Sequence, residues 1–282
     1  MKLASYTSHG KAFYGLITDA GAADLSARLP ACPTLFDAIC AMGMDGIAKA
    51  AEGAEVTHSA FTYLPPLPNA RRIICVGVNF PDRNAEYKDG SEQPKHMSLF
   101  PRFISGFVGH EDALIRPPES EKLDYEGEIA IVIGTPGRRI AKADAYDHIC
   151  ALTLCNEGTI RDWVRHAKFN VTQGKNWDRS GAMGPWIVPF TDPAQIEDAR
   201  VQTRVNGELR QDDVLSNMMF PVRTQIAYIS TFMALEAGDI IVTGTPTGAG
   251  ARLDPPQFLR PGDDVTVTVD GIGTLRNGVA DE

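Results

Sequence analysis

The sequence has few cysteines, no Cys-x-x-Cys pair and no long apolar run. Its 5 cysteines are odd in number, which argues against a disulfide framework, and the missing Cys-x-x-Cys spacing argues against a thiolate zinc site. No apolar run approaches the roughly 18 residues that a membrane-spanning helix needs, and the first residues lack the apolar segment of a signal peptide. These absences predict a cytoplasmic protein that does not enter a membrane.

Positive charge is also scarce, because 27 Lys and Arg residues face 36 Asp and Glu residues, for a formal net charge of −9. Nucleic-acid binding depends on Lys and Arg side chains that neutralise phosphates, so this balance argues against a nucleic-acid partner. It also argues against an anionic membrane surface. Hydrophobic residues make up 43% of the 282 residues, which is enough for a core. We therefore expect a globular protein, and the excess carboxylates are candidates for binding a cation.

A proline cluster suggests how the chain is organised. The segment Leu64-Pro65-Pro66-Leu67-Pro68 cannot lie inside a helix or a central strand. We therefore predict a small N-terminal α+β domain over residues 1–68 and a larger domain over residues 69–282. Two short strands and a helix over residues 34–52, with Thr34 as its N-cap, are expected in the first domain.

The larger domain has apolar strand runs in series and few helices, which predicts a mainly β, α+β fold rather than a doubly wound α/β fold. Asn206-Gly207 between two polar-apolar runs is a strong hairpin signal. The best helix candidates are residues 160–168 and 221–234. The clearest strand runs are Ile73–Val78, Ile129–Ile133, Ile149–Leu154, Trp186–Pro189, Val201–Val205, Ile240–Val242 and Val265–Val269.

Two glutamates, Glu126 and Glu128, directly precede the buried strand Ile129–Ile133. Side chains two residues apart on a strand point to the same face. Two carboxylates in one pocket repel each other unless a cation lies between them, and Mg²⁺, Mn²⁺ and Ca²⁺ prefer oxygen ligands. The spacing therefore suggests a metal site, with a solvated acidic strand edge as the alternative.

Glu157 follows the apolar strand Ile149–Leu154, where its side chain can point into a site built from strand ends. A third carboxylate would complete an oxygen-only triad with open positions for water and substrate. Arg161, one turn further on, could bind a substrate carboxylate in a bidentate manner. The alternative is a salt bridge from Arg161 to Asp162 or Glu157.

Two glycine-containing segments add candidate substrate contacts. Gly174-Lys175 is a loop without the P-loop pattern. Lys175 could stabilise an enolate or oxyanion, although a loop lysine taken alone is more often solvated. In the segment 244–250, Gly244 permits close approach of the backbone to a ligand and Thr245 offers a hydroxyl and an amide. A structural glycine-rich turn is the alternative reading of that segment.

The segment Asn79–Tyr87 follows the first strand of the larger domain. Glu86 could act as a general base. Arg83 lies three residues earlier, so the two could pair on one helical face, and such a pair would also explain them without any catalytic role. Phe80 is a candidate substrate contact.

In this order the segments resemble the fumarylacetoacetate hydrolase family. The resemblance covers roughly residues 70–282 and rests on four ordered motifs, which are Tyr125–Gly134, Asn156–Asp162, Gly174-Lys175 followed by Gly184-Pro185-Trp186, and Gly238–Pro246. It implies a mixed β-roll catalytic domain after a small N-terminal domain, usually in a homodimer. It also implies Mg²⁺ or Mn²⁺, sometimes Ca²⁺, that chelates a 2-oxo acid or β-diketo acid. Family members hydrolyse acylpyruvates, decarboxylate oxaloacetate, or isomerise and hydrate related enol acids.

The resemblance also implies roles for single residues. It makes Glu126, Glu128 and Glu157 metal ligands, Arg161 and Thr245 substrate contacts, and Lys175 a stabiliser of negative charge.

The sequence departs from the family pattern at two positions. Glu157 stands where the family usually has aspartate, so the position or denticity of the metal is expected to differ. Arg83 stands where hydrolytic members have the histidine of a His–Glu dyad, and arginine cannot carry a proton because its pKa is above 12. Arg83 could instead hold Glu86 ionised or bind a substrate carboxylate. His110 is a candidate for the missing imidazole, but we expect it to be a solvated histidine or a structural histidine with its hydrogen bonds made.

The leading hypothesis is a metal-dependent hydrolase that cleaves a C–C bond in an acylpyruvate-type substrate, as in aromatic catabolism. The metal would act as Lewis acid and template, Glu86 would assist the attacking water, and Lys175 would help to stabilise the pyruvate enolate. An oxo-acid decarboxylase or an enol-acid isomerase or hydratase is the alternative on the same scaffold. A non-catalytic metal- or ligand-binding protein is the alternative from another class.

Overall fold

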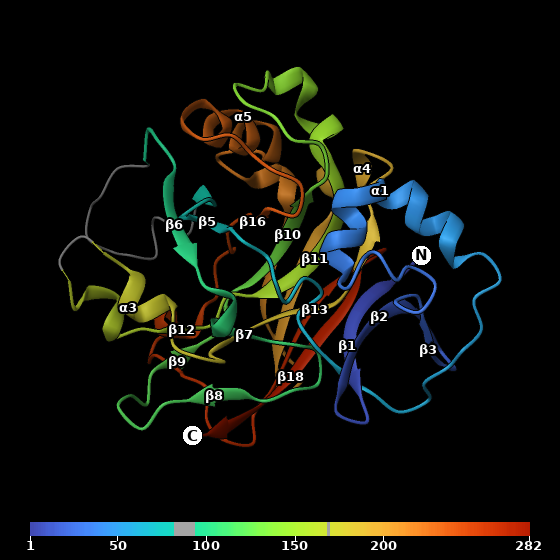
Figure 1. Ribbon diagram of the computed structural model, residues 1–282. Helices are drawn as coiled ribbons and strands as arrows, with labels where there is room; N and C mark the ends of the chain where they lie inside the picture. The colour runs from blue at the N-terminus through green and yellow to red at the C-terminus, as the bar shows by residue number, and fades with distance from the viewer. Residues whose placement is uncertain (82–93, 168–169) are drawn as a thin grey trace.

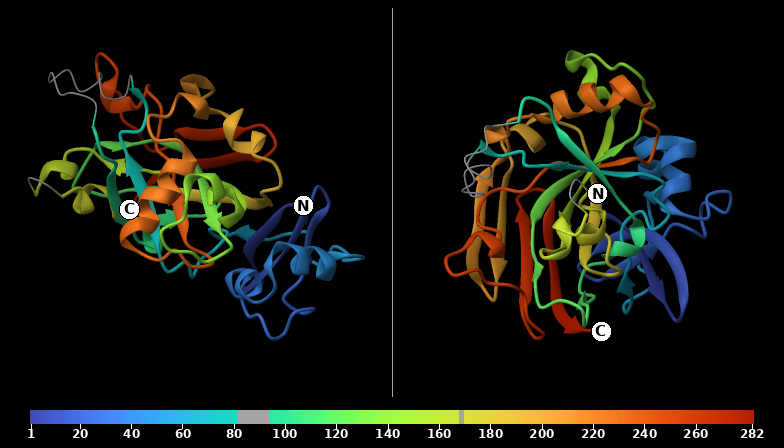
Figure 2. Two further views of the ribbon diagram at one scale, coloured as in Figure 1. Left: turned by 90° about the horizontal axis from the view of Figure 1, so that it is seen from above. Right: turned by 90° about the vertical axis from the view of Figure 1, so that its left-hand side faces the viewer.

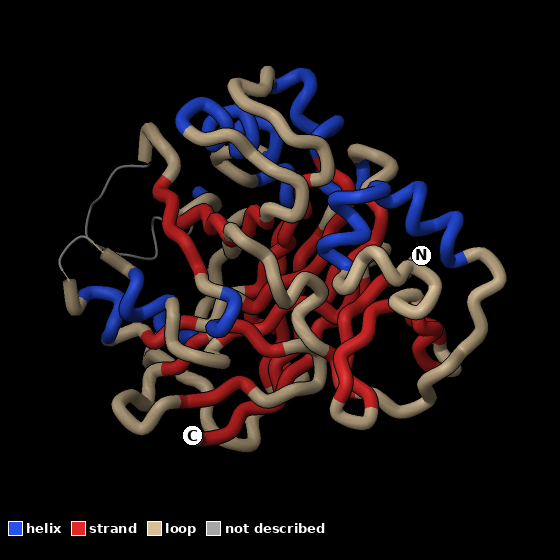
Figure 3. The backbone as a smooth tube through the Cα atoms, viewed as in Figure 1, coloured by secondary structure: helices blue, strands red, loops and turns tan. Residues whose placement is uncertain are grey.

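Strands form the body of the protein, and the helices lie on its periphery (Figures 1 and 3). The computed structural model describes residues 1–81, 94–167 and 170–282. Within these residues the strands are arranged as one 11-stranded sheet, one 5-stranded sheet and one 2-stranded sheet. The prediction of a mainly β, α+β fold is confirmed.

The 11-stranded sheet carries the candidate site in its central strands. Antiparallel pairing dominates, although β16 (Ile240–Val242) pairs with β5 (Ile73–Gly77) in parallel. The central strands β10 (Gly127–Ile133), β11 (Ile149–Asn156) and β16 are buried at every position except the partly buried Cys150, which explains their largely apolar sequence. Across the sheet the strands are β3 (Gly21–Asp24), β2 (Lys11–Thr18), β1 (Leu3–Ser8), β13 (Gly181–Pro189), β11 (Ile149–Asn156), β10 (Gly127–Ile133), β16 (Ile240–Val242), β5 (Ile73–Gly77) and β6 (Ser98–Arg102), with β4 (Thr62–Tyr63) beside β1 and β7 (Phe107–Val108) beside β13.

The 5-stranded sheet consists of β15 (Glu208–Val214), β14 (Arg200–Val205), β17 (Asp264–Val269), β18 (Gly273–Asp281) and β8 (Leu114–Arg116) in this order, and β12 (Thr159–Ile160) with β9 (Leu123–Asp124) forms the small sheet. The predicted hairpin joins β14 to β15. Asn206 and Gly207 have φ values of 51° and 82°, as a tight hairpin turn requires.

Two of the three predicted helices are confirmed. Helix α1 (Leu35–Ala51) begins after Thr34, whose side chain accepts a hydrogen bond from the backbone N–H of Asp37 in a capping box. Helix α5 (Val222–Phe232) packs beside the 3₁₀ helix η2 (Lys142–His148). The remaining helical pieces are short: η1 (Ile104–Gly106), η3 (Trp163–Arg165), α3 (Thr172–Lys175), α4 (Ala194–Glu197), η4 (Leu215–Asn217) and η5 (Gly250–Arg252).

The predicted helix over residues 160–168 is wrong. Thr159 and Ile160 pair with Asp124 and Leu123, and the 3₁₀ turn η3 is the one helical piece among the described residues 161–167. The β-branched pair fits a strand better than a helix, so pairing with β9 overrides the apolar spacing.

The N-terminal segment, blue in Figure 2, lies at one end of the molecule. Its first strand joins the large sheet, with Leu3 opposite Ile187. One hydrophobic cluster contains both Leu35 of α1 and Val132 of β10. The domain boundary at residue 68 stays a prediction. Among the described residues no helix is long and apolar enough to cross a membrane.

Candidate metal centre and active site

Three glutamates converge at the ends of the two central strands. Glu126 directly precedes β10, Glu128 lies within it, and Glu157 directly follows β11. The strands pair with Gly127 opposite Asn156, and this register places the carboxylates together. One oxygen from each carboxylate lies within 4.8 Å of the others, and the exposed fractions of the three residues are 4%, 1% and 2%. The structure thus brings the predicted triad into one buried cluster.

The loop after β16 holds Glu128. The backbone N–H of Gly244 donates a hydrogen bond to Glu128 Oε2 at 2.5 Å. Gly244 has a φ of 107°, and a Cβ atom there would lie 2.6 Å from Asn79 Cβ. Only glycine therefore lets the backbone come close enough to reach the carboxylate.

Thr245 is fixed by two hydrogen bonds beside the triad. Its Oγ1 donates to the carbonyl of Gly127 at 3.0 Å and accepts from Gln211 Nε2 at 2.8 Å. Gln211 Oε1 in turn accepts from the backbone N–H of Gly127 at 2.9 Å. Gln211 was not predicted, because nothing in the sequence of β15 distinguishes it from a solvated polar residue.

Lys175 lies between two of the glutamates. It ends the short helix α3, so the predicted Gly-Lys loop is helical here. Its Nζ donates to Glu126 Oε2 and lies 3.1 Å from Glu157 Oε1. Burial by itself would lower the pKa of Lys175, but the charges of Glu126 and Glu157 outweigh it and the pKa is raised. Lys175 is therefore held as a buried ammonium.

Arg161 forms ion pairs with Asp124 and Glu126, whereas the sequence suggested Asp162 or Glu157 as partners. Its Nε donates to Asp124 Oδ2 at 2.6 Å and its Nη2 to Glu126 Oε1 at 2.8 Å. Asp124 also accepts from the backbone N–H of Gly250 at 2.8 Å. The alternation Asp124, Glu126, Glu128 was the signal in the sequence that could have found Asp124.

Arg102 is a second residue that the sequence did not reveal. Its side chain is fully buried, and its Nη1 lies 3.4 Å from Glu157 Oε1. The same nitrogen donates to the carbonyl of Gly158 at 2.9 Å, and the guanidinium stacks over Phe107 at 4.4 Å. Arg102 thus fixes the start of the segment after β11.

A small cavity of about 160 Å³ opens onto the triad. Its described lining combines the charged cluster with apolar side chains: Val76, Gly77, Val78, Ser98, Phe100, Glu126, Glu128, Glu157, Arg161, Val164, Val171, Lys175 and Thr245. A few polar groups in a lining that is otherwise apolar are typical of small-molecule sites.

The other predicted site residues lie elsewhere. Phe80 is buried in the hydrophobic core and is not among the described residues that line the cavity. Arg83 and Glu86 fall outside the described residues. The Nδ1 of His110 accepts a hydrogen bond from the backbone N–H of Arg276, and its ring packs edge-on against Tyr63. These contacts give His110 a structural role, as expected from the sequence.

The donor set fits a hard divalent cation. All the donors are carboxylate oxygens, which suit Mg²⁺, Mn²⁺ and Ca²⁺. Burial, followed by the charges of Glu157 and Glu126, raises the pKa of Glu128 well above its usual value. Among the described residues no cationic side chain lies within ion-pair distance of Glu128, whereas Lys175 contacts both other glutamates. A cation beside Glu128 would offset this repulsion.

A family model described as the C-terminal region of fumarylacetoacetate (FAA) hydrolase matches residues 72–280. The chain belongs to the fumarylacetoacetate hydrolase family. Oxaloacetate tautomerase YisK of Bacillus subtilis (strain 168) is 43% identical over 217 residues, which cover 76% of this chain and 71% of that protein. The mitochondrial oxaloacetate tautomerase Fahd2a of Rattus norvegicus is 33% identical over 264 residues, covering 92% of this chain and 84% of the relative.

The fumarylacetoacetate hydrolase of the psychrophile Exiguobacterium antarcticum has a solved structure that matches with a TM-score of 0.86 and 34% identity, covering 100% of both chains. Membership of the fumarylacetoacetate hydrolase family confirms the predicted resemblance and fold. Because its relatives are enzymes, it also supports an enzyme with the metal-dependent chemistry of the family. The identity of the ion, C–C bond hydrolysis, aromatic catabolism, the homodimer and the cytoplasmic location stay predictions.

Proposed function

We propose that the protein is a metal-dependent tautomerase that interconverts the enol and keto forms of a small 2-oxo dicarboxylic acid of the oxaloacetate type. The observation that carries this proposal is the buried ammonium of Lys175, which shares one small cavity with Glu126, Glu128 and Glu157. A fixed cation beside a metal-binding cluster is suited to an enolate. The names of the two tautomerases similar to this chain support the reaction class.

Glu126, Glu128 and Glu157 would hold Mg²⁺ or Mn²⁺, with Ca²⁺ as a third candidate. Bound there, the cation would supply Lewis-acid polarisation of the 2-oxo acid.

Lys175 contributes a positive charge that is already in place before the reaction. Its contacts with Glu126 and Glu157 keep it protonated and fix its position. Such a preorganised charge needs no reorientation when the enolate oxygen becomes negative, which is why it favours the enolate over the neutral keto and enol forms.

Arg161 is placed to recognise a carboxylate of the substrate. Its Nε and Nη2 each donate one hydrogen bond, to Asp124 and Glu126, which in the described part of the chain leaves the Nη1 hydrogens and the second Nη2 hydrogen for a ligand. The predicted bidentate contact would therefore use the Nη1–Nη2 edge of the guanidinium. The cavity of about 160 Å³ is smaller than the roughly 300–1,000 Å³ of drug-sized ligand sites, which favours a compact acid.

Tautomerisation needs less machinery than hydrolysis. The enol O–H bond breaks and a C–H bond forms at the neighbouring carbon, so no water has to attack and no histidine has to activate it. Arg83 in place of the dyad histidine is compatible with this reaction. Hydrolysis of an acylpyruvate is the second candidate, and the similarity to the Exiguobacterium antarcticum hydrolase favours it.

The test is the rate at which enol oxaloacetate is converted to the keto form, followed by the loss of enol absorbance with Mg²⁺ or Mn²⁺ and again with chelator. We expect metal-dependent acceleration. Lys175→Met should lower kcat by about 100- to 1,000-fold, and Lys142→Met, at an exposed position of η2, should leave it unchanged. No acceleration by the metal-loaded wild type would refute the tautomerase proposal. Release of two shorter acids from an acylpyruvate would support hydrolysis instead.

A further inference from the structure

Tyr125 and Glu126 are neighbours in the sequence, but they line two different cavities. Glu126 lines the small cavity at the triad, and Tyr125 lines a separate cavity of about 420 Å³ on the side of the 5-stranded sheet. This second volume falls within the roughly 300–1,000 Å³ of ordinary small-molecule sites. Apart from Tyr125, its wall comes from the turn between β14 and β15, from Arg210 of β15 and from the segment 255–263.

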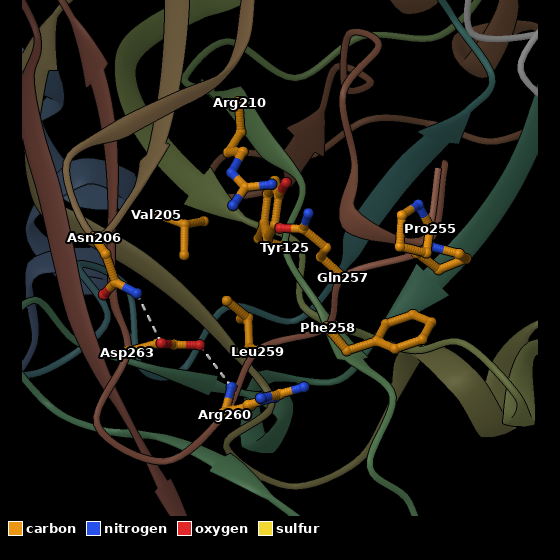
Figure 4. A pocket seen from close by; sticks show the side chains of 11 residues that line it. Tyr125, Val205, Asn206, Arg210, Pro255, Gln257, Phe258, Leu259, Arg260 and Asp263 are labelled. Atoms are coloured by element: carbon orange, nitrogen blue, oxygen red, sulfur yellow. Dashed lines mark hydrogen bonds between the residues drawn. The ribbon is translucent and has the colours of Figure 1, made fainter. Parts of the chain in front are cut away.

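The middle of this cavity is apolar and its two ends are polar. Figure 4 shows Arg210, Tyr125 and Gln257 gathered at one end, Asp263 and Arg260 at the other, and the apolar side chains of Val205 and Leu259 between them. Such a wall suits an organic molecule with a polar group at its end rather than an inorganic ion.

Arg210 has donor capacity that the described residues do not use. Its Nε is buried and has no hydrogen-bond partner there. Its Nη2 lies 3.0 Å from Glu208 Oε2, but the Glu208 side chain is 68% exposed, so water competes for that pair. A ligand carboxylate can therefore bind the guanidinium of Arg210, because the described residues use only some of its hydrogen-bond donors.

Arg260 supplies the second positive charge. Within the described residues its guanidinium makes no hydrogen bond or ion pair. Its backbone N–H donates to Asp263 Oδ2, and its backbone carbonyl accepts from the N–H of Asp263. Asp263 also accepts from Asn206 Nδ2 at 2.8 Å, so its oxygens are directed into the turn. The described lining of this cavity therefore has two guanidinium groups and one internally bonded carboxylate, in a protein whose formal net charge is −9.

We propose that this second cavity is a binding site for a small organic diacid, with one carboxylate recognised by Arg210, the other by Arg260, and the carbon skeleton against Val205 and Leu259. The site is distinct from the triad and does not depend on the proposed tautomerase function. Bidentate contact between guanidinium and carboxylate supplies the specificity, and the apolar wall excludes strongly hydrated ions.

The test is calorimetric titration of the metal-free, full-length protein with succinate, and separately with inorganic phosphate. We expect saturable binding of one succinate per chain. Arg260→Met and Arg210→Met should each weaken it at least tenfold, and Arg260→Met is the safer variant because residue 260 is exposed. Lys175→Met, which alters only the triad cavity, should leave the affinity unchanged.

The proposal would be overturned by any of the following results. The first is no saturable binding of succinate. The second is equal affinity in the wild type and both arginine variants, or a loss of affinity in Lys175→Met, which would place the ligand in the triad cavity. The third is binding of phosphate without succinate, which would exclude recognition of an organic acid.

Discussion

The backbone N–H of Gly244 donates a hydrogen bond to Glu128 Oε2, and this single contact joins the glycine-rich loop after β16 to the middle of the triad. The two residues are 116 positions apart in the sequence. Glu128 has no cationic partner within ion-pair distance among the described residues, so its orientation depends on this backbone donor.

Replacing Gly244 by alanine should weaken metal binding. The new Cβ atom would lie 2.6 Å from Asn79 Cβ, at a φ of 107°, so the loop must move and its donor leaves Glu128. We expect a loss of about 1–3 kcal/mol in the free energy of unfolding and roughly tenfold weaker Mn²⁺ binding, measured by thermal unfolding and titration calorimetry. The matched control is Gly207→Ala, which has a φ of 82° but open space around it. An unchanged Mn²⁺ affinity in Gly244→Ala would show that the loop does not position Glu128.

The substitution Glu128→Gln should have opposite effects on metal binding and on the stability of the metal-free protein. It removes a charged ligand, so Mn²⁺ affinity should fall by more than the roughly 10- to 100-fold expected for a supporting residue. It also removes a buried charge that faces Glu126 and Glu157, so the Tm measured in chelator should rise. A Tm that falls in chelator, or an unchanged Mn²⁺ affinity, would contradict the assignment of Glu128 as a ligand. Glu111→Gln, at an exposed side chain, is the control.

Arg102 should be a large contributor to stability. Its buried guanidinium holds Glu157 and the carbonyl of Gly158, and Arg102→Leu leaves both without this donor. Breaking a buried ion pair from one side costs about 3 kcal/mol or more. Arg116→Leu removes an ion pair with Asp281, whose side chain is 54% exposed, and should cost only about 0–1 kcal/mol. Equal losses in urea unfolding for the two variants would mean that Arg102 does not act through the buried cluster.

His110 should make the stability depend on pH. Burial lowers its pKa, and its Nδ1 must be unprotonated to accept the N–H of Arg276. Since the folded pKa lies below the unfolded value of about 6.5, the unfolded chain binds the proton more readily. The contribution is therefore complete above the unfolded pKa and is lost as the pH falls through it towards the folded pKa.

The measurement is the free energy of unfolding as a function of pH. His110→Asn keeps an acceptor for the Arg276 N–H but removes the titration, so the slope below about pH 6.5 should become smaller. His9→Asn is the control, because residue 9 is exposed in a turn with a φ of 48°, a backbone conformation that asparagine tolerates. The explanation fails if His110→Asn retains the full slope.

Much of the fold could be read from the sequence, because the relevant signals are local. The apolar runs around Ile129–Ile133 and Ile149–Leu154, the Thr34 cap and the Asn206-Gly207 turn each depend on a few adjacent residues. The motifs that include Glu126, Glu128 and Glu157 likewise identify the family from the order of residues along the chain alone. The helix predicted over residues 160–168 failed where a distant strand paired with that segment.

The sequence by itself determined the apolar strands around Ile129–Ile133 and Ile149–Leu154, that Glu126 and Glu128 share a face, and which family the chain resembles. Only the tertiary structure decided that Arg161 pairs with Asp124 and Glu126, that Arg102 supports Glu157 and that Tyr125 lines a second cavity. The physical reason is the range of the interactions. Strand periodicity is set by neighbours along the chain, whereas these contacts are set by the order and register in which distant strands pair.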